Sequence, residues 1–324
     1  MNGSIDIFVE LGRRLESFGK DSLSQRVIQA AMEENDWFRH DDIILAVKAI
    51  REEFLNREKL ISWTAAYKKC ESQKVLIIMA GNIPLVGFFD LMCVLMAGHT
   101  ALVKPSSKDK VMTEYIIKLL QDIYPTIPIE PYGGEQEFDM VIATGGDQAA
   151  KYFRDKYNNL PTIIRGSRHS LAVLDGNESK SDIEALCEDI ISYNGLGCRN
   201  VSLLMINKEL PMPFPLCTPS DMHRQNYAHT KAMRTILGQR FIDYGCYIFV
   251  KEDSFPESIS QINIIQYDTI EQVEEWLKSN DEKIQCIVSN IINHPRRVAF
   301  GRAQYPTLWD YADGVDVMKF LTEE

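Results

Sequence analysis

Seven cysteines are spread along the 324-residue chain, and one of them, Cys198, stands in a setting unlike the others. It lies in the stretch "ISYNGLGCRNVS", bracketed by a glycine and Arg199, directly after a helical pattern. A cysteine reacts as its thiolate, and backbone N–H groups or nearby cations lower the pKa of a thiol. The setting favours a nucleophilic Cys198, and an incidental cysteine in a glycine turn is the alternative.

Other cysteines have surroundings typical of packing. Cys93 lies in an apolar helical run, Cys187 in a helical pattern and Cys286 in an alternating segment. The seven cysteines have no CxxC spacing, and the six histidines form no HExxH or other metal-binding pattern. We therefore expect reduced thiols and no metal site.

A second candidate is Asn82 in the turn "MAGNIP", which follows the apolar segment "KVLII". Open α/β sheets bind their ligands at the carboxyl ends of strands. The Asn82 amide could donate a hydrogen bond to a developing oxyanion. It could equally bond its own backbone, as asparagines in turns commonly do.

The turn "ATGGDQ" and the strand end "TALVK" are two further candidate binding elements. The glycines would let a phosphate approach the N–H groups at a helix start, although Asp147 could cap that helix itself. Lys104 could be a ligand contact or a solvated strand end. Neither GxGxxG nor GxxxxGK[ST] occurs, so the usual dinucleotide fingerprint and a P-loop are not predicted.

The elements that must position these residues alternate between strand and helix patterns from Lys74 onward. Apolar strands are expected at 74–80, 100–104, 139–144 and 161–165, with helices between them, Pro84 in the first turn of one helix and Gly98 at its end. Such alternation predicts a parallel sheet covered by helices. Since single cores rarely exceed about 250 residues, we expect an α/β fold with two lobes and a cleft between them.

Four segments follow from these patterns. A helical segment, 1–73, packs on a first α/β lobe, 74–178; a second α/β lobe, 179–300, contains Cys198; and a tail, 301–324, returns to the lobe interface. A proline-rich stretch after 207 is expected to be a loop.

Charge and hydropathy argue against a nucleic-acid-binding protein, a membrane-spanning protein and a secreted protein. The formal net charge of -11 argues against a nucleic-acid partner. The most apolar run, 83–97, contains Asp90 and is shorter than the roughly 20 residues that span a bilayer. The first residues lack the pattern of a secretory signal, so we expect a cytoplasmic protein.

The order of "AGNIPLVGFFDLMCVLMAGHTALVKPSS", "ATGGD" and "NGLGCRN" resembles the aldehyde dehydrogenase superfamily. The tail "YPTLWDYADGVD" and the wording of the first stretch look most like its acyl-CoA reductases of the LuxC type, over about 74–320. The resemblance implies parallel-rich sheets, an NADP-binding first lobe and a catalytic second lobe, with the cofactor and catalytic cleft between them. It also implies that Cys198 is the nucleophile and that Asn82 is the side-chain oxyanion donor.

The same resemblance assigns cofactor contacts. It implies that Lys104 reaches the adenosine ribose with Ser106 nearby, and that Thr144, Gly145 and Gly146 form the turn beside the cofactor. Members that prefer NAD commonly have an acidic residue near 106–107, and none is present here. Its absence favours NADPH.

Two departures from the family pattern shape the expected reaction. Arg165 stands about where members that hydrolyse thioesters have a glutamate base, and "PESISQINII" has no clear match to the element that holds the nicotinamide ribose. Without a base to activate water, oxidation to a free acid is disfavoured. The resemblance then implies NADPH-dependent reduction of an acyl thioester, from acyl-CoA or an acylated partner protein, to an aldehyde.

Alternatives stay open at this point: an acyl-phosphate reductase of the same superfamily, a cofactor-free cysteine acyltransferase or thioesterase, or a nucleotide-binding protein without activity. A homodimer is also an option, because superfamily members often dimerise.

Two residue groups have undecided roles. Arg165, Arg168 and His169 could meet phosphates or form a solvated edge. Arg302, Trp309 and Asp310 could border an acyl pocket, but a packing or interface role is favoured. These roles are expectations for the structure to test.

Overall fold

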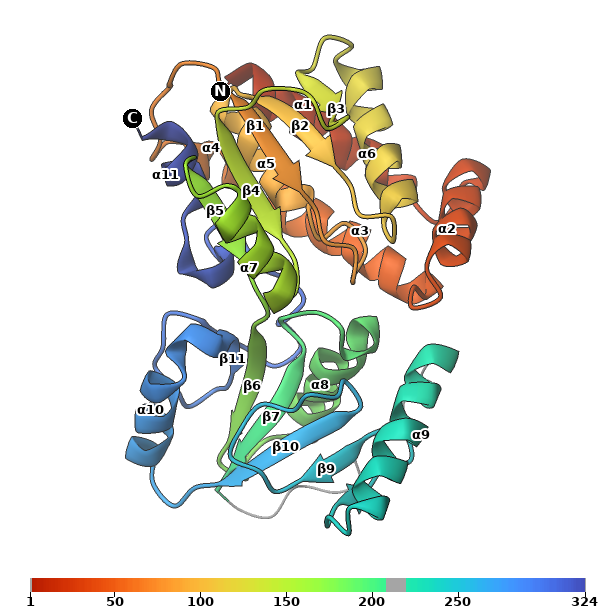
Figure 1. Ribbon diagram of the computed structural model, residues 1–324, viewed down its shortest axis with the longest axis vertical. Helices are drawn as coiled ribbons and strands as arrows, with labels where there is room; N and C mark the ends of the chain where they lie inside the picture. Colours follow the sequence, from red (N-terminus) through yellow and green to blue (C-terminus); the bar gives the residue numbers. More distant parts are fainter. Residues whose placement is uncertain (1, 208–219, 324) are drawn as a thin grey trace. The chain divides into compact units, whose positions relative to one another are not determined.

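The computed structural model of the protein describes residues 2–207 and 220–323. The chain forms two compact units (Figure 1). Unit 1 comprises Met1–Ser167 and Pro306–Glu324, and unit 2 comprises Arg168–Tyr305. The prolines of the predicted proline-rich loop, at 211–219, lie outside the described residues.

Unit 1 is built on a five-stranded sheet in the order β3-β2-β1-β4-β5, with every neighbouring pair parallel. Its strands are β1 Lys74–Ile78, β2 Thr100–Lys104, β3 Ile129–Pro131, β4 Met140–Thr144 and β5 Thr162–Arg165. Its α-helices are α1 Asn2–Arg14, α2 Ser22–Glu34, α3 His40–Phe54, α4 Arg57–Thr64, α5 Phe88–Ala97, α6 Lys110–Ile123, α7 Asp147–Lys156 and α11 Val317–Thr322.

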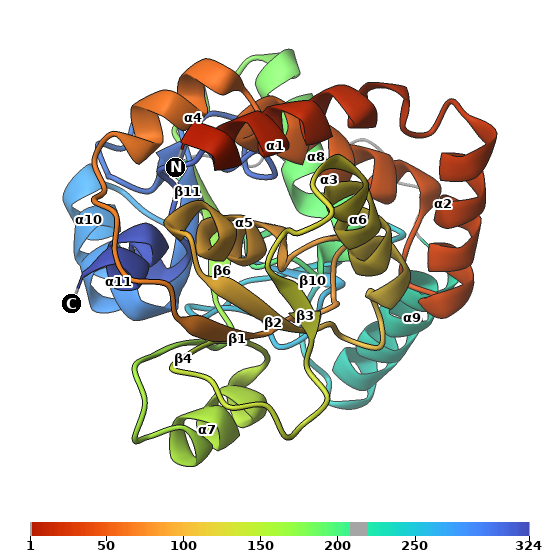
Figure 2. The same ribbon diagram turned by 90° about the horizontal axis from the view of Figure 1, so that it is seen from above.

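The two faces of this sheet are covered by different helices (Figure 2). Alternate residues of β1 point to opposite faces: Val75 and Ile77 pack with α1, α5 and α6, whereas Leu76 and Ile78 pack with α7. Residues of the N-terminal helices share the first of these cores, so these helices pack on that face of the sheet.

Among its described residues, unit 2 has a seven-stranded sheet in the order β12-β11-β6-β7-β10-β9-β8, in which only the β8–β9 pair is antiparallel. Its strands are β6 His169–Leu174, β7 Val201–Ile206, β8 Ile242–Asp243, β9 Ile248–Val250, β10 Gln261–Gln266, β11 Ile284–Val288 and β12 Arg297–Val298. Its α-helices are α8 Lys180–Ile191, α9 Asp221–Ile236 and α10 Ile270–Ser279. Helix α8 packs on one face of the sheet and α10 on the other.

The structure confirms the α/β class and the parallel sheets and corrects the predicted boundaries. The first unit ends at Ser167 rather than at 178, because β6 pairs with β7 and β11 of the second sheet. The tail divides at Pro306, and its helix α11 packs against α5.

One local prediction is wrong, one is confirmed, and one helix was not predicted. Pro84 is not in the first turn of a helix, because 84–87 form a turn and α5 begins at Phe88. Gly98 does end that helix, with a left-handed φ of 96°. Helix α9 was not predicted, since it buries little apolar surface: His223 and Thr230 are its buried residues.

Candidate functional site

Predicted cofactor and oxyanion residues of unit 1 lie along one edge of its sheet. Ile78 at the end of β1 pairs with Lys104 at the end of β2 and with Ala143 of β4. The turn with Asn82 follows β1, and Thr144 is the last residue of β4. The carboxyl ends of three adjacent parallel strands therefore bring these residues to a single edge, where open α/β sheets bind ligands.

The turn before α5 is held close to the loop after β2. A Cβ atom on Gly81 would lie 2.5 Å from Ser106 Oγ, so only glycine fits there. The Asn35 Nδ2 group donates to the carbonyl oxygens of Gly81, at 3.3 Å, and of Lys108, at 3.1 Å. Asn82 itself is exposed. The N-terminal helical segment thus supports both the Asn82 turn and the Ser106 loop.

A buried carboxyl group holds the other end of this turn. Leu85 has a left-handed φ of 57°, and its N–H donates to Asp109 Oδ2 at 2.8 Å. Burial, reinforced by the Glu34 charge, raises the pKa of Asp109 to about 8. Its other oxygen, Oδ1, is buried without a hydrogen-bond partner among the described residues.

The glycine turn between β4 and α7 is tight on one side and open on the other. A Cβ atom on Gly145 would lie 2.9 Å from the Cβ of Ala149, whereas one on Gly146 would meet nothing within 4 Å. The N–H of Gly146 has no partner among the described residues. Asp147 does not cap α7 as proposed, because its Oδ1 accepts a hydrogen bond from the N–H of Ser167 at 2.8 Å.

Arg165 forms a buried ion pair with Asp90, so a solvated edge is wrong for this residue. Its Nη1 and Nη2 donate to the two Asp90 oxygens at 2.7 and 3.0 Å, and both side chains are less than a tenth exposed. Nη1 also donates to Thr144 Oγ1 at 3.3 Å. The pair thus joins α5 and β5 to the predicted cofactor turn.

The other members of the predicted basic cluster have separate partners in unit 2. Arg168 donates to the carbonyl of Ile284 at 3.2 Å. The His169 ring stacks on Phe255, with the ring centroids 4.7 Å apart. Each of the three residues thus has a partner of its own among the described residues.

In unit 2 the Cys198 loop begins with a left-handed turn. Tyr193, Asn194 and Gly195 have φ values of 51°, 54° and 77°. A Cβ atom on Gly195 would lie 3.2 Å from the carbonyl oxygen of Ile259, so this glycine permits both the conformation and the close packing. Cys198 follows with an exposed side chain.

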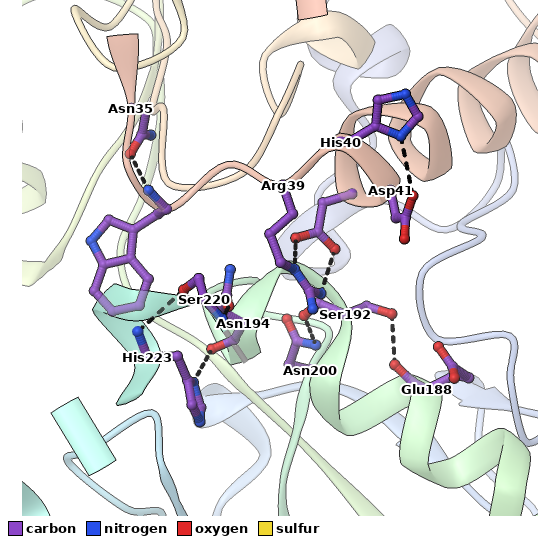
Figure 3. A network of polar contacts seen from close by, with 12 residues as sticks. Asn35, Arg39, His40, Asp41, Glu188, Ser192, Asn194, Asn200, Ser220 and His223 are labelled. Carbon is purple, nitrogen blue, oxygen red and sulfur yellow. Dashed lines mark hydrogen bonds and ion pairs between the residues drawn. The ribbon is translucent and has the colours of Figure 1, made fainter. Parts of the chain in front are cut away.

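Asn200 holds the loop to the end of α8, from which it emerges (Figure 3). Its Oδ1 accepts the N–H of Gly197 at 2.8 Å, and its Nδ2 contacts the carbonyl oxygens of Asp189, Ile190 and Ser192 at 2.8–3.2 Å. The Asn200 side chain is buried, so these bonds are shielded from water. They fix the backbone on both sides of the cysteine.

Ser170 fixes the loop from the adjacent strand. Its Oγ donates to the carbonyl oxygen of Cys198 at 2.9 Å and accepts the N–H of Cys286 at 3.1 Å. Ser170 is fully buried. The exposed thiol of Cys198 therefore stands on a backbone anchored from β6 and α8.

Arg199 and the tail residues Arg302 and Asp310 each have a contact nearby in the structure. Arg199 Nε donates to the carbonyl oxygen of Ala303, so this guanidinium binds the backbone of the C-terminal segment. The Arg302 guanidinium lies 4.6 Å from the centroid of the Tyr305 ring. Asp310 accepts from Thr307, and Trp309 is half exposed.

The other described cysteines differ from Cys198. Burial raises the pKa of the Cys93 thiol well above its usual value and that of Cys187 to about 12. Cys286 is buried as well, so packing fits all three. The expectation that every cysteine is reduced is wrong for Cys246, which is in a disulfide.

Several residues that shape the site escaped sequence reasoning: Asn35, Asp90, Asp109, Ser170 and Asn200. Only Asp90 gave a local signal, as a charge inside an apolar helix. Asn82 belongs to unit 1 and Cys198 to unit 2, and their pairing in one site stays a prediction.

Comparisons with known proteins identify the fold. An aldehyde dehydrogenase from Bartonella henselae matches with a TM-score of 0.63 and 10% identity, covering 90% of this chain and 79% of its own. A betaine aldehyde dehydrogenase from Staphylococcus aureus, solved with NAD+, matches with a TM-score of 0.63 and 12% identity, covering 90% of this chain and 77% of its own. The protein therefore has an aldehyde-dehydrogenase-like fold.

Sequence comparisons find similarity to one group of enzymes, the acyl thioester reductases. The family described as acyl-CoA reductase (LuxC) matches residues 23–132. Long-chain acyl-protein thioester reductases from Photorhabdus laumondii and Aliivibrio fischeri are 23% and 25% identical over 172 and 170 residues, which cover 48% and 45% of this chain. The matched region is 35% of the length of each relative. This part of the chain is therefore similar to the LuxC-type acyl-CoA reductases, and the fold is that of the aldehyde dehydrogenases.

Within the described part of the chain, no helix combines the length and apolar character that crossing a membrane requires.

Proposed function

We propose that the protein reduces an acyl thioester to an aldehyde through an acyl-enzyme on Cys198, with NADPH as the reductant. The observation that supports this most is the Cys198 loop: an exposed thiol on a backbone anchored by the buried side chains of Asn200 and Ser170. A fixed nucleophile with an approachable thiol suits attack on a thioester carbonyl. The names of the two curated relatives agree with this substrate class.

In the proposed first half-reaction, the Cys198 thiolate attacks the acyl carbon, and the Asn82 amide and the Cys198 N–H stabilise the oxyanion. Collapse breaks the bond to the leaving thiol and leaves a thioester on Cys198. A bound nicotinamide cofactor would supply the hydride that reduces this thioester. Release of the aldehyde then restores the Cys198 thiolate.

The residues present in unit 1 fit such a cofactor. Gly146 precedes the ten-residue helix α7, its N–H has no partner among the described residues, and no neighbouring atom fills the space beside it. N–H groups at a helix start bind phosphate oxygens. Lys104, exposed at the same sheet edge, and Ser106 would contact the ribose. The absence of an acidic side chain at 106–107 favours NADPH over NADH.

The ion pair of Arg165 supports reduction over hydrolysis. Arg165 stands about where thioester-hydrolysing members of the superfamily have a glutamate base, and here it is bound to Asp90. A guanidinium stays protonated and has no acceptor atom, so Arg165 cannot activate water as a base. We also propose that the protein is cytoplasmic and that it forms a homodimer.

The test is NADPH consumption with acyl-CoAs of graded length, with the aldehyde trapped and identified. Mass spectrometry without NADPH should detect an acyl group on Cys198. Cys198→Ala should abolish both signals, while Cys286→Ala, which removes a buried thiol, should retain acylation. Aldehyde formation by Cys198→Ala would refute the proposal, and acylation without NADPH consumption would favour an acyltransferase or thioesterase.

A further inference from the structure

A cavity of about 580 Å³ lies wholly within unit 2, between helix α9 and the segment 252–261. One face of α9 forms a wall of it, through Asn226, Thr230 and Met233, and Leu237 continues this wall. Its volume falls within the range of roughly 300–1,000 Å³ that is typical of small-molecule sites. No residue assigned above to catalysis or to the cofactor lines it.

One part of the cavity lining is a fixed pair of charges. Arg234 of α9 donates to both carboxylate oxygens of Glu252 and, at 3.0 Å, to Gln261 Oε1. Gln261 is 2% exposed, so its end of this network is shielded from water. The two charges cancel, which leaves the exposed Glu257 as the remaining acidic group of the lining. Phosphates and fatty carboxylates would therefore meet no net positive charge here.

Neutral polar groups form a second part of the lining. Asn226 Oδ1 accepts hydrogen bonds from Ser258 Oγ at 2.9 Å and from Ser260 Oγ at 2.7 Å. Thr230 Oγ1 contacts Ser258 Oγ at 2.7 Å. The Asn226 Nδ2 group has no partner among the described residues, so it is available to donate to a ligand carbonyl.

Apolar surface lies beside these donors and acceptors. Met233 is 44% and Leu237 62% exposed on the α9 wall, and Phe255 and Pro256 lie on the opposite wall. The cavity thus suits an elongated neutral ligand that has both amide or hydroxyl groups and apolar carbon.

Helix α9 and the segment 252–261 also contact the loop that leads to Cys198, through residues outside the cavity lining. The carbonyl oxygen of Ile259, between Ser258 and Ser260, lies 3.2 Å from the position of a Cβ atom on Gly195. His223 of α9 contacts the carbonyl oxygen of Asn194 at 3.4 Å (Figure 3). The two elements that line the cavity therefore pack against Asn194 and Gly195, which precede Cys198 by four and three residues.

We propose that this cavity binds the pantetheine arm of the acyl donor, an inference that rests on the proposed function. The arm is long and neutral and contains two amides, hydroxyl oxygen and methyl groups, which matches the lining. Held there, its thioester would be presented to Cys198: the Cys198 sulfur bonds to the acyl carbon, the bond to the pantetheine sulfur breaks, and pantetheine leaves as the thiol after taking up a proton.

Calorimetric titration with S-methyl pantetheine, an unreactive thioether, tests the site directly. Met233→Trp should fill the cavity and weaken binding about tenfold or more, and Asn226→Asp should weaken it through loss of the amide donor and an added negative charge. Ile236→Trp is the matched control, because Ile236 is on α9 and 78% exposed but does not line the cavity. Circular dichroism establishes that each variant is folded.

Acylation kinetics distinguish this inference from the proposed function. Octanoyl-pantetheine should acylate Cys198 about tenfold more slowly in Met233→Trp, whereas octanoyl-N-acetylcysteamine, which lacks most of the arm, should react equally with both proteins. Equal binding of S-methyl pantetheine by wild type and Met233→Trp, or binding of an acylated cysteine peptide in its place, would overturn the inference. If neither thioester acylates wild-type Cys198, the proposed function itself fails.

Discussion

Asn200 is the residue on which the placement of Cys198 depends most directly. It binds Gly197 on one side of the cysteine and three carbonyl oxygens at the end of α8. Asn200→Ala removes all four bonds and leaves buried backbone groups unpaired. Because each such group costs roughly 1–3 kcal/mol, the loop should lose its fixed conformation. We expect the rate of Cys198 acylation to fall by about tenfold or more, measured by stopped-flow or quenched mass spectrometry.

The control for this prediction is Asn177→Ala, since Asn177 is an exposed asparagine in the same unit. A merely structural role for Asn200 would lower the melting temperature and leave the acylation rate of the folded protein unchanged. That result would show that Asn200 contributes to folding stability and not to the acylation of Cys198.

Asn82 provides a test of the oxyanion role. Its side chain is exposed in a turn fixed through Gly81 and Leu85, so Asn82→Ala should preserve the turn. Loss of one oxyanion donor typically costs about 100-fold or more in rate. We expect that loss in acylation of Cys198, with NADPH affinity unchanged by fluorescence titration. A variant whose acylation rate stays within threefold of wild type would leave Asn82 as a turn residue only.

Single residues also mark the limit of sequence reasoning. Cys198 was recognisable because its glycine neighbours are next to it in the chain. Ser170 was not, because its contact with Cys198 spans 28 residues and depends on the pairing of β6 with β7. Local patterns identify a reactive group, whereas the groups that hold it are brought together by sheet topology.

At the scale of elements, the Asp90–Arg165 pair joins helix α5 to strand β5. Asp90→Asn would leave a buried guanidinium without its counter-charge, at a cost of about 3–5 kcal/mol. We expect hydrogen exchange to speed up across α5 and β5. The double variant Asp90→Leu, Arg165→Met should recover most of this stability, because it buries no charge. If the double variant is as unstable as Asp90→Asn, packing rather than charge explains the effect.

The loop before α6 should make stability depend on pH through Asp109. Burial raises the pKa of this carboxyl to about 8, above its value of 3.8 in an unfolded chain. Between these values the folded state binds the proton and the unfolded state does not, so stability falls as pH rises from about 4 to about 8. Asp109→Asn keeps an oxygen for the Leu85 N–H and cannot ionise.

The measurement is the melting temperature of Asp109→Asn minus that of wild type. We expect this difference to become more positive from pH 5 to pH 8, while Asp122→Asn, at an exposed position on α6, gives no such trend. A difference that is constant with pH would mean that Asp109 does not titrate in this range.

Elements were predictable where burial creates a pattern. The strands β1, β2 and β4 and the helices α5 and α6 agree with the apolar periodicity of the sequence. Helix α9 was missed because most of its surface is exposed and its few buried residues are polar. The part of the unit 2 cavity that α9 lines could therefore not be predicted from hydrophobic periodicity.

At the scale of the whole molecule, the sequence predicted two α/β bodies but misplaced their boundary. No composition change marks Ser167, because β6 follows β5 after three residues and has the same apolar character. What separates the strands is pairing: β5 pairs with β4, and β6 pairs with β7 and β11. Such long-range pairing is specified by the complete set of strands and not by the local sequence.

This division predicts that the two half-reactions separate by unit. Cys198 and its anchors Asn200 and Ser170 lie in unit 2, whereas the proposed cofactor residues, Lys104 among them, lie in unit 1. Lys104→Ala removes a charged hydrogen-bond donor, so the KM for NADPH should rise about tenfold or more. Acyl-enzyme should still form at the wild-type rate and accumulate, as measured by quenched mass spectrometry, and Cys198→Ala should still bind NADPH. If Lys104→Ala slows acylation as strongly as reduction, Lys104 serves the acyl donor as well, and the assignment of one half-reaction to each unit is wrong.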